Sequence, residues 1–303
     1  MTDGDGRVRV ALSELIALRN RIGRLKLPPQ DSRATHIGTH TSRLYGRGMD
    51  YAESRAYQPG DDVRRMDWRL TARSGRLHTK LFQEEREGQL LIVLDQHASM
   101  RFGTRVRFKS VQAARAAASA AWYAARAGER VGLMTFGGHA HLQRPRAGVR
   151  GALDMCGAIA RCDANSSDQS QALSEALHNL AKLQHSANRV LLISDGQSTD
   201  EAARRRMVET MRHTALRVLV VADALELQLA PPGQYPIEHA GERHQLTLQS
   251  AQQRRNFQRR LGAGQARLVQ MAQSLGIPCR VIDTAADPLE PVLALLRDAG
   301  GHR

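Results

Sequence analysis

The chain has 303 residues and a formal net charge of +14, a length that suits one large domain with extensions or two small domains. No stretch holds the roughly 18 uninterrupted apolar residues of a membrane-spanning helix. The N-terminal stretch MTDGDGRVRV carries acids and no apolar core, so it does not match a secretion signal. We therefore expect a cytoplasmic protein, and peripheral contact with the inner membrane through partners stays open.

The excess of positive charge narrows the partner classes to nucleic acid, an anionic membrane surface or an acidic protein. Four of the 44 cationic residues are lysines, and the charge is spread along the chain rather than gathered in a tail, which disfavours nucleic acid. Cys156, Cys162 and Cys279 show no CxxC spacing. We therefore expect free thiols, and neither a disulfide framework nor a zinc site.

The N-terminal part of the chain differs from the rest. Residues 9–26 predict an amphipathic helix, which the PPQD stretch ends. The segment from there to residue 88 combines scattered aromatic residues with dense mixed charge. We expect residues 1–88 to form an N-terminal helix and a β-containing extension, either as a separate domain or wrapped around the remainder. The apolar stripe of the helix consists of Leu12, Leu15, Ile16, Ile22 and Leu25.

From residue 89 onward, short apolar strands alternate with helical segments, which is typical of a doubly wound, mostly parallel α/β sheet. Residues 226–249 interrupt the alternation and predict a β-hairpin or an irregular insertion. We expect residues 89–303 to form one α/β domain. Strands are predicted over 90–95, 131–136, 139–146, 189–195, 216–223 and 278–284, and helices over 108–128, 149–161, 168–184, around Arg204–Arg206, and over 251–274 and 287–298.

Three predicted strands end in an acid, namely Asp95, Asp195 and Asp223. Doubly wound sheets carry their sites at the carboxyl ends of the strands, so we expect at least two of these carboxylates to converge. After Asp95, His97 and Ser99 follow at every second position and could face the same point. Carboxylate and hydroxyl oxygens suit Mg²⁺, whereas imidazole is a poorer match for that ion.

Several stretches together resemble one known family. They are GRGMDYAESRAYQPGDDVRRMDWRLTARSGRLHTKLFQEERE, LLIVLDQHASMRFG with Lys109 after it, GERVGLMTFG and LLISDG, within about residues 10–223. They resemble the domain of unknown function family 58. Members resemble von Willebrand factor A domains and are usually encoded beside MoxR-type AAA+ ATPases. The resemblance implies a von Willebrand factor A-like fold with a doubly wound, mostly parallel sheet.

The resemblance also implies a metal-ion-dependent adhesion site that holds Mg²⁺ or another divalent cation. Its D-x-S-x-S motif falls on Asp95, His97 and Ser99, and its final aspartate falls on Asp195. A threonine ligand has no counterpart, and serines of DANSSDQS, Ser167 among them, are the candidates. His97 could point away or select Zn²⁺ or Mn²⁺. The alternative is a site that has lost its metal, in which Asp95 and Asp195 bind loop amides.

The block YQPGDDVRRMDWR contains a Pro59-Gly60 turn and dense charge. One interpretation is a surface for partner recognition, because arginine and aromatic side chains are favoured at interface hot spots. The other is a charge-networked loop that packs Trp68 and Tyr57 against the α/β domain. The candidate partner-binding residues are Gln58, Asp61, Asp62, Arg64, Arg65 and Trp68.

The sequence contains no P-loop, GxSxG, GxGxxG or HExxH motif, so we expect no nucleotide hydrolysis. The leading hypothesis, implied by the resemblance, is a non-enzymatic, chaperone-like adaptor or assembly factor. It would act with a MoxR-type AAA+ ATPase and bind a membrane complex or another A-domain protein through the carboxyl edge of the sheet. One alternative is a metal-dependent hydrolase at Asp95, His97 and Asp195. The other is a basic nucleic-acid-binding protein that uses Arg204–Arg206, Arg254, Arg255, Arg259 and Arg260.

Overall fold

A computed structural model describes residues 3–25, 49–84, 88–164, 171–181, 188–239 and 242–297. The chain divides into two compact units. The first contains Met1–Lys26 and Gly88–Arg303, and the second contains Leu27–Glu87. The N-terminal helix belongs to the first unit, where it packs on the α/β domain.

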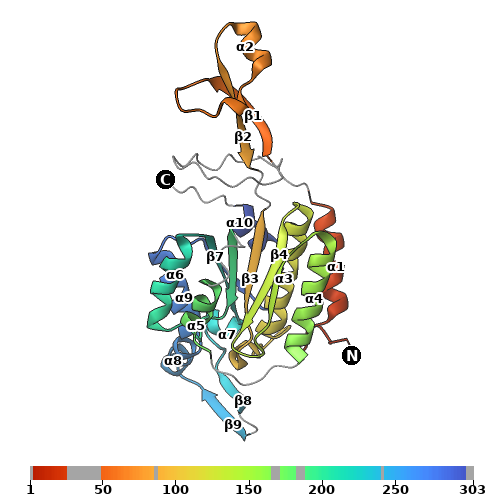
Figure 1. The fold of residues 1–303 in the computed structure, drawn as a ribbon. Helices are drawn as coiled ribbons and strands as arrows, with labels where there is room; N and C mark the ends of the chain where they lie inside the picture. Colours follow the sequence, from red (N-terminus) through yellow and green to blue (C-terminus); the bar gives the residue numbers. More distant parts are fainter. Residues whose placement is uncertain are drawn as a thin grey trace. The chain divides into compact units, whose positions relative to one another are not determined.

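A six-stranded sheet forms the centre of the first unit (Figure 1). Its order is β10-β7-β6-β3-β4-β5, and every pair is parallel except β4 with β5. The chain therefore enters the sheet at a central strand and adds strands first toward one edge and then toward the other, as predicted. The strands are β3 (Gln89–Asp95), β4 (Arg130–Phe136), β5 (Leu142–Ala147), β6 (Arg189–Ser194), β7 (Ala215–Ala222) and β10 (Cys279–Asp283).

Helices cover both faces of this sheet, which explains why its central strands are almost wholly apolar. On one face, Leu91 and Val93 pack with apolar residues of α5, α6 and α9. On the other face lies α3, whose alanines let it approach β3 closely while almost fully buried. The helices are α3 (Lys109–Arg126), α4 (Gly148–Ala164), α5 (Leu173–Ala181), α6 (Glu201–Met211), α7 (Ala224–Leu227), α8 (Ala251–Leu261), α9 (Ala263–Ser274) and α10 (Leu289–Arg297).

The N-terminal helix, α1 (Leu12–Gly23), lies against α3. Trp122 of α3 donates an indole hydrogen bond to the Leu15 carbonyl oxygen at 2.9 Å. The predicted apolar stripe was partly wrong, because Ile16 is 38% exposed and Leu18 is buried in its place. Residues three or four apart lie on the same side of a helix, so Leu15, Leu18 and Ile22 share one face of α1.

The region predicted as an interruption forms an antiparallel hairpin of β8 (Gly233–His239) and β9 (Glu242–Leu248). The prediction of one helix over 251–274 was wrong, because the chain breaks at Gly262 into α8 and α9. A Cβ at Gly262 would lie 2.9 Å from the Glu226 carbonyl oxygen, so this close approach requires glycine. The segment from α7 through α8 is called the insertion arm below.

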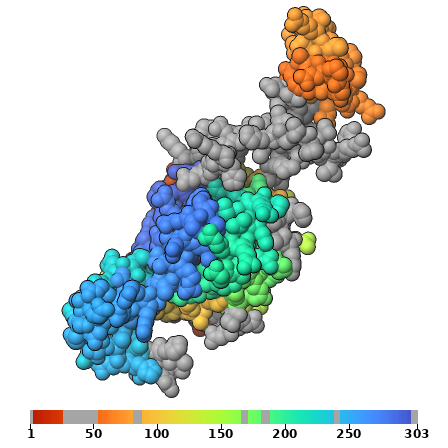
Figure 2. Space-filling view, turned by 90° about the vertical axis from the view of Figure 1, so that its left-hand side faces the viewer, coloured from red at the N-terminus to blue at the C-terminus, as the bar shows by residue number. Residues whose placement is uncertain are grey.

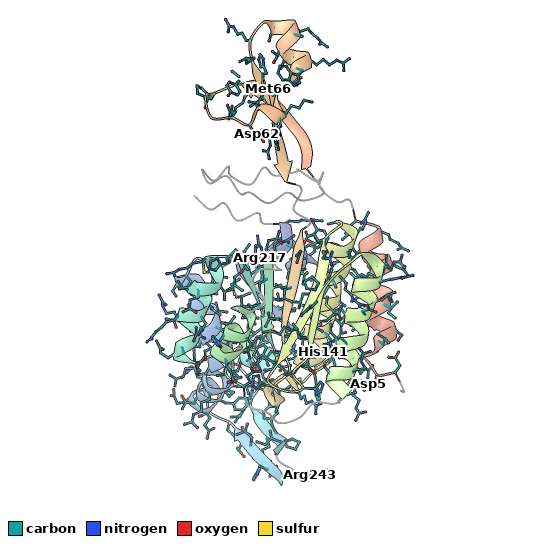
Figure 3. The ribbon with its side chains drawn as sticks, viewed as in Figure 1. Asp5, Asp62, Met66, His141, Arg217 and Arg243 are labelled. Carbon is teal, nitrogen blue, oxygen red and sulfur yellow. The ribbon has the colours of Figure 1, made fainter. Side chains whose placement is uncertain are left out.

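The second unit is a β-hairpin with two short helices between its strands. Asp62 accepts a hydrogen bond from Arg64 N and caps η1, and Asp67 accepts one from Leu70 N and caps α2. Met66 is buried between the two helices (Figure 3). The elements are β1 (Met49–Ala56), η1 (Val63–Arg65), α2 (Trp68–Ser74) and β2 (His78–Glu84).

Two other expectations concern the chain as a whole. Among the described residues, no helix is both long enough and apolar enough to cross a membrane. The three cysteines are free thiols, with Cys156 and Cys162 buried.

Candidate functional site

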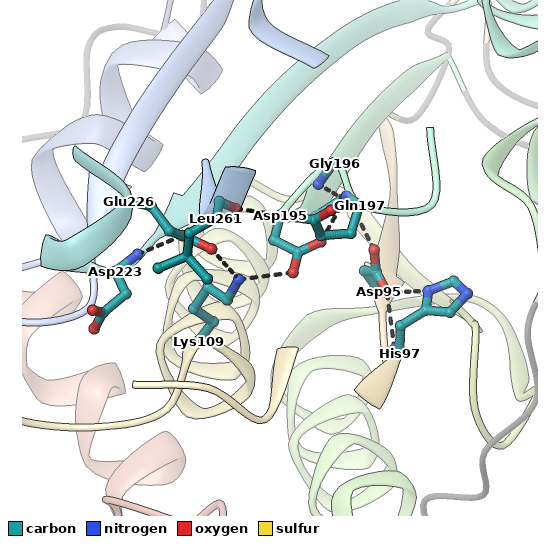
Figure 4. Close-up of polar contacts among 10 residues, drawn as sticks. Asp95, His97, Lys109, Asp195, Gly196, Gln197, Asp223, Glu226 and Leu261 are labelled. Atoms are coloured by element: carbon teal, nitrogen blue, oxygen red, sulfur yellow. Dashed lines mark hydrogen bonds and ion pairs between the residues drawn. The ribbon is translucent and has the colours of Figure 1, made fainter. Parts of the chain in front are cut away.

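Asp95 is the last residue of β3 (Figure 4), and its carboxylate is fully buried. Its Oδ1 accepts hydrogen bonds from His97 N at 2.9 Å and from His97 Nδ1 at 2.6 Å. Its Oδ2 accepts one from Ser194 Oγ at 2.6 Å. Both oxygens are therefore satisfied by groups of this chain, and the bond to His97 N is the loop-amide contact that the metal-free alternative expected.

The His97 ring points toward Asp95 and not toward a position where it could bind a metal ion. Its Nε2 accepts a hydrogen bond from Gln171 N at 3.3 Å, which assigns the ring proton to Nδ1. The ring also packs edge-on against Phe136, with 5.6 Å between centroids. Gly137 makes room for it, because its φ is +81° and a Cβ there would lie 2.1 Å from Nδ1. Both ring nitrogens are thus engaged within the protein.

Asp195, at the end of β6, belongs to a buried ion-pair network. Its Oδ2 accepts from Lys109 Nζ at 2.8 Å, and its Oδ1 accepts from Gln197 N at 2.9 Å. The same ammonium donates to Glu226 Oε1 at 2.7 Å. The three charged side chains are at most 2% exposed. Burial lowers the pKa of Lys109, but the charges of Asp195 and Glu226 raise it by more, so the ammonium stays charged at neutral pH.

Asp223, at the end of β7, is the third predicted carboxylate. It caps α7 through Leu225 N at 3.0 Å and accepts from Thr104 Oγ1 at 2.6 Å and Thr284 Oγ1 at 3.1 Å. Burial raises its pKa, but these hydrogen bonds lower it by more, so its pKa lies below the usual range. β3, β6 and β7 are parallel neighbours in the sheet, so the expectation that at least two of these carboxylates converge at one edge is confirmed.

The described residues do not fit the divalent ion that the resemblance implied. Mg²⁺ needs about six oxygen ligands, whereas the oxygens of Asp95 and Asp195 are already engaged. Ser99 Oγ, Ser198 Oγ and Thr199 Oγ1 are buried without a partner, but uncharged hydroxyls alone do not hold Mg²⁺. Ser167 lies outside the described residues. In the part of the chain that the structure describes, no group of three or more His, Cys, Asp or Glu side chains could hold a metal.

Sequence reasoning missed Lys109 and Glu226 as members of this site. One signal was present, since lysine is rare in this arginine-rich chain. Lys109 is also the first residue of α3, where the helix dipole disfavours a cation. A lysine in that position needs a nearby anion to stabilise it. Neither spacing nor motif pointed to Glu226, which lies 117 residues away.

The candidate partner surface in the second unit uses its acids within the unit. Asp61 pairs with Arg55 at 2.7 Å. Since Asp62 and Asp67 cap helices, the acids of this block are used internally. The exposed candidates are Gln58, Asp62, Arg64, Arg65 and Trp68, and Trp68 is 63% exposed.

Comparisons with known proteins give one family and several similar proteins. Residues 53–267 match the family described as Protein of unknown function DUF58. Uncharacterized protein Rv1480 of Mycobacterium tuberculosis is 29% identical over 259 residues, which cover 84% of this chain and 81% of that protein. Among solved structures, conserved hypothetical protein BatB from Bacteroides thetaiotaomicron has 16% identity and a TM-score of 0.43, covering 69% of this chain and 97% of that one. The SpRpn10 VWA domain has 8% identity and a TM-score of 0.37, covering 69% and 94%.

Proposed function

Because the chain belongs to the family Protein of unknown function DUF58 and has a von Willebrand factor A-like fold, we propose that it is a non-enzymatic adaptor. It binds protein partners through the carboxyl edge of its α/β unit and acts with a MoxR-type AAA+ ATPase. One observation supports the proposal that the adaptor has no enzymatic activity. Asp95, Asp195 and Asp223 are buried, and each is paired within the chain. Carboxylates held in this way support loops and are not free to act as a general base.

The hydrolase alternative lacks support for the same reason. His97 Nδ1 is bonded to Asp95, and its Nε2 lone pair is directed at Gln171 N. A general base needs that lone pair within reach of a reacting hydroxyl or water. We therefore derive no catalytic step from Asp95, His97 and Asp195.

The insertion arm supports binding at the carboxyl edge. It joins β7 to α9, and Figure 2 shows it in light blue, standing out from one end of the α/β unit. α8 buries none of its residues and exposes Arg255, Arg259 and Arg260. Arg243 projects from β9, the outer part of the arm (Figure 3). A helix without a buried face adds little to the core, and a cationic surface suits an acidic partner.

The second unit supplies a further candidate contact surface. Trp68 is 63% exposed and Val63 is 55% exposed, beside the exposed Arg64 and Arg65. Large aromatic and arginine side chains dominate the energy of many interfaces, whereas an exposed tryptophan gains little for a free monomer. We assign Val63, Arg64, Arg65 and Trp68 to partner contact.

The test is gentle purification of the tagged full chain from its native cells, followed by mass spectrometry of what co-elutes. We expect a MoxR-type ATPase. Trp68→Ala should weaken its capture by about tenfold, the effect of a moderate hot spot. Leu77→Ala, in the same unit and 49% exposed, is the matched control and should retain the ATPase.

The arm is tested in the same way. Arg255→Ser with Arg259→Ser should reduce capture of the acidic partner, whereas Val208→Ser on α6 should not. Capture of nucleic acid alone, or ester or phosphoester turnover that Asp95→Asn abolishes, would overturn the adaptor proposal.

A further inference from the structure

We propose that the Lys109 ammonium is a permanent internal cation that does the work of a divalent ion at the carboxyl edge, so that the wild-type edge binds no metal. The resemblance places the final metal ligand on Asp195. In the structure, Asp195 Oδ2 lies 2.8 Å from Lys109 Nζ. The ammonium also lies 2.7 Å from Glu226 Oε1, which no metal motif includes. The cation that neutralises this edge is thus part of the chain.

In this network, each of the four carboxylate oxygens of Asp195 and Glu226 accepts a hydrogen bond from the chain. Lys109 Nζ donates to one oxygen of Asp195 and one of Glu226. The remaining oxygens accept from the backbone, Asp195 Oδ1 from Gln197 N at 2.9 Å and Glu226 Oε2 from Asp223 N at 2.7 Å. The ammonium also lies 5.7 Å from the centroid of the Phe102 ring, within cation–π range. An incoming ion would have to displace a buried ammonium that already donates to both carboxylates.

The network also joins segments that are distant in the sequence. Lys109 begins α3, Asp195 follows β6, and Glu226 lies in α7, where the insertion arm starts. A metal at this edge would connect the same loops only when it is bound. A lysine connects them in every folded molecule. The base of the arm is therefore held in one arrangement, whatever the concentration of divalent ions.

The inference predicts that removing the ammonium creates a metal site. Lys109→Ala leaves the Asp195 and Glu226 carboxylates facing an emptied space, with oxygen ligands that suit Mn²⁺ or Mg²⁺. We would titrate the full-length chain with Mn²⁺ and follow the electron paramagnetic resonance signal of the free ion. The wild type should leave Mn²⁺ free up to about 1 mM, the weak end of protein divalent sites. Lys109→Ala should bind one ion at least about tenfold more tightly than that limit.

The control is Lys109→Ala combined with Asp195→Asn, which should lose the new site. Binding of one Mn²⁺ by the wild type that Asp195→Asn removes would overturn the inference. A folded Lys109→Ala protein that binds no Mn²⁺ would also overturn it, because the ammonium would then not occupy a cation site. If Lys109→Ala does not fold, the wild-type titration decides. The Mn²⁺ titration involves no partner protein, so a result that contradicts this inference leaves the adaptor proposal untouched.

Discussion

Replacing Lys109 by methionine should destabilise the α/β unit severely. Methionine keeps the length and the apolar stem of the side chain but removes the ammonium. Its loss leaves Asp195 and Glu226 buried side by side without their shared cation. Breaking a buried pair by removing one partner costs about 3–5 kcal/mol of unfolding free energy. For a unit of this size, each kcal/mol shifts the melting temperature by roughly 2–4 °C, so we expect a fall of about 10 °C.

Urea denaturation followed by tryptophan fluorescence measures this loss. Trp122 is 3% exposed in α3 and reports on the α/β unit, whereas Trp68 is already exposed in the folded chain. Lys80→Met in the second unit is the matched control and should change stability by less than about 0.5 kcal/mol. Adding Glu226→Gln to Lys109→Met should restore part of the loss, because one uncompensated charge disappears. A loss below about 1 kcal/mol for Lys109→Met would refute the reasoning.

Three further predictions follow from the same geometry. The folded pKa of Lys109 lies above its unfolded value of about 10.4, so the stability that its ammonium contributes is fully present below that value. In urea titrations, the stability difference between wild type and Lys109→Met should therefore shrink as the pH rises through the folded pKa of Lys109. Gly137→Ala forces a Cβ onto the His97 ring at positive φ, and thermal denaturation should show a loss of at least about 1–3 kcal/mol of unfolding free energy. Gly60→Ala, also at positive φ but in open space, should lose less. Trp122→Phe removes the indole donor to the Leu15 carbonyl and should cost about 0.5–1.5 kcal/mol, with Trp68→Phe as the neutral control.

The fold was predictable because its signals are local. Each core strand is a short apolar run, and a parallel sheet covered on both faces needs such runs. The position of the acids was predictable from the same rule, since Asp95 ends a strand and Asp195 and Asp223 directly follow strands. The break at Gly262 had a local signal, since Gly262 and Gly264 stand inside the predicted helix, whereas the close approach of Gly262 to the Glu226 carbonyl depends on tertiary structure. The placement of α1 on α3 likewise depends on a tertiary contact through Trp122.

The site was predictable only in its position, because its chemistry depends on pairing across the topology. Lys109 is 86 residues from Asp195 and 117 from Glu226, and no spacing rule connects them. His97 was a visible departure from the motif, but its direction toward Asp95 depends on the room that Gly137 leaves. The motif therefore predicted a ligand set, whereas the structure has carboxylates that are already bound by their neighbours.

His97 and Lys109 can be understood together. Where the family's motif has a hydroxyl, His97 brings a ring N–H to Asp95 at 2.6 Å, and Lys109 brings an ammonium to Asp195 at 2.8 Å. A metal ion or its bound water would otherwise contact these carboxylates. His97 and Lys109 each put a donor from this chain in that place. A partner carboxylate would then find no open metal coordination position at this edge. Binding would depend instead on exposed side chains such as Arg255 and Arg259, so chelators should leave it intact while added salt weakens it.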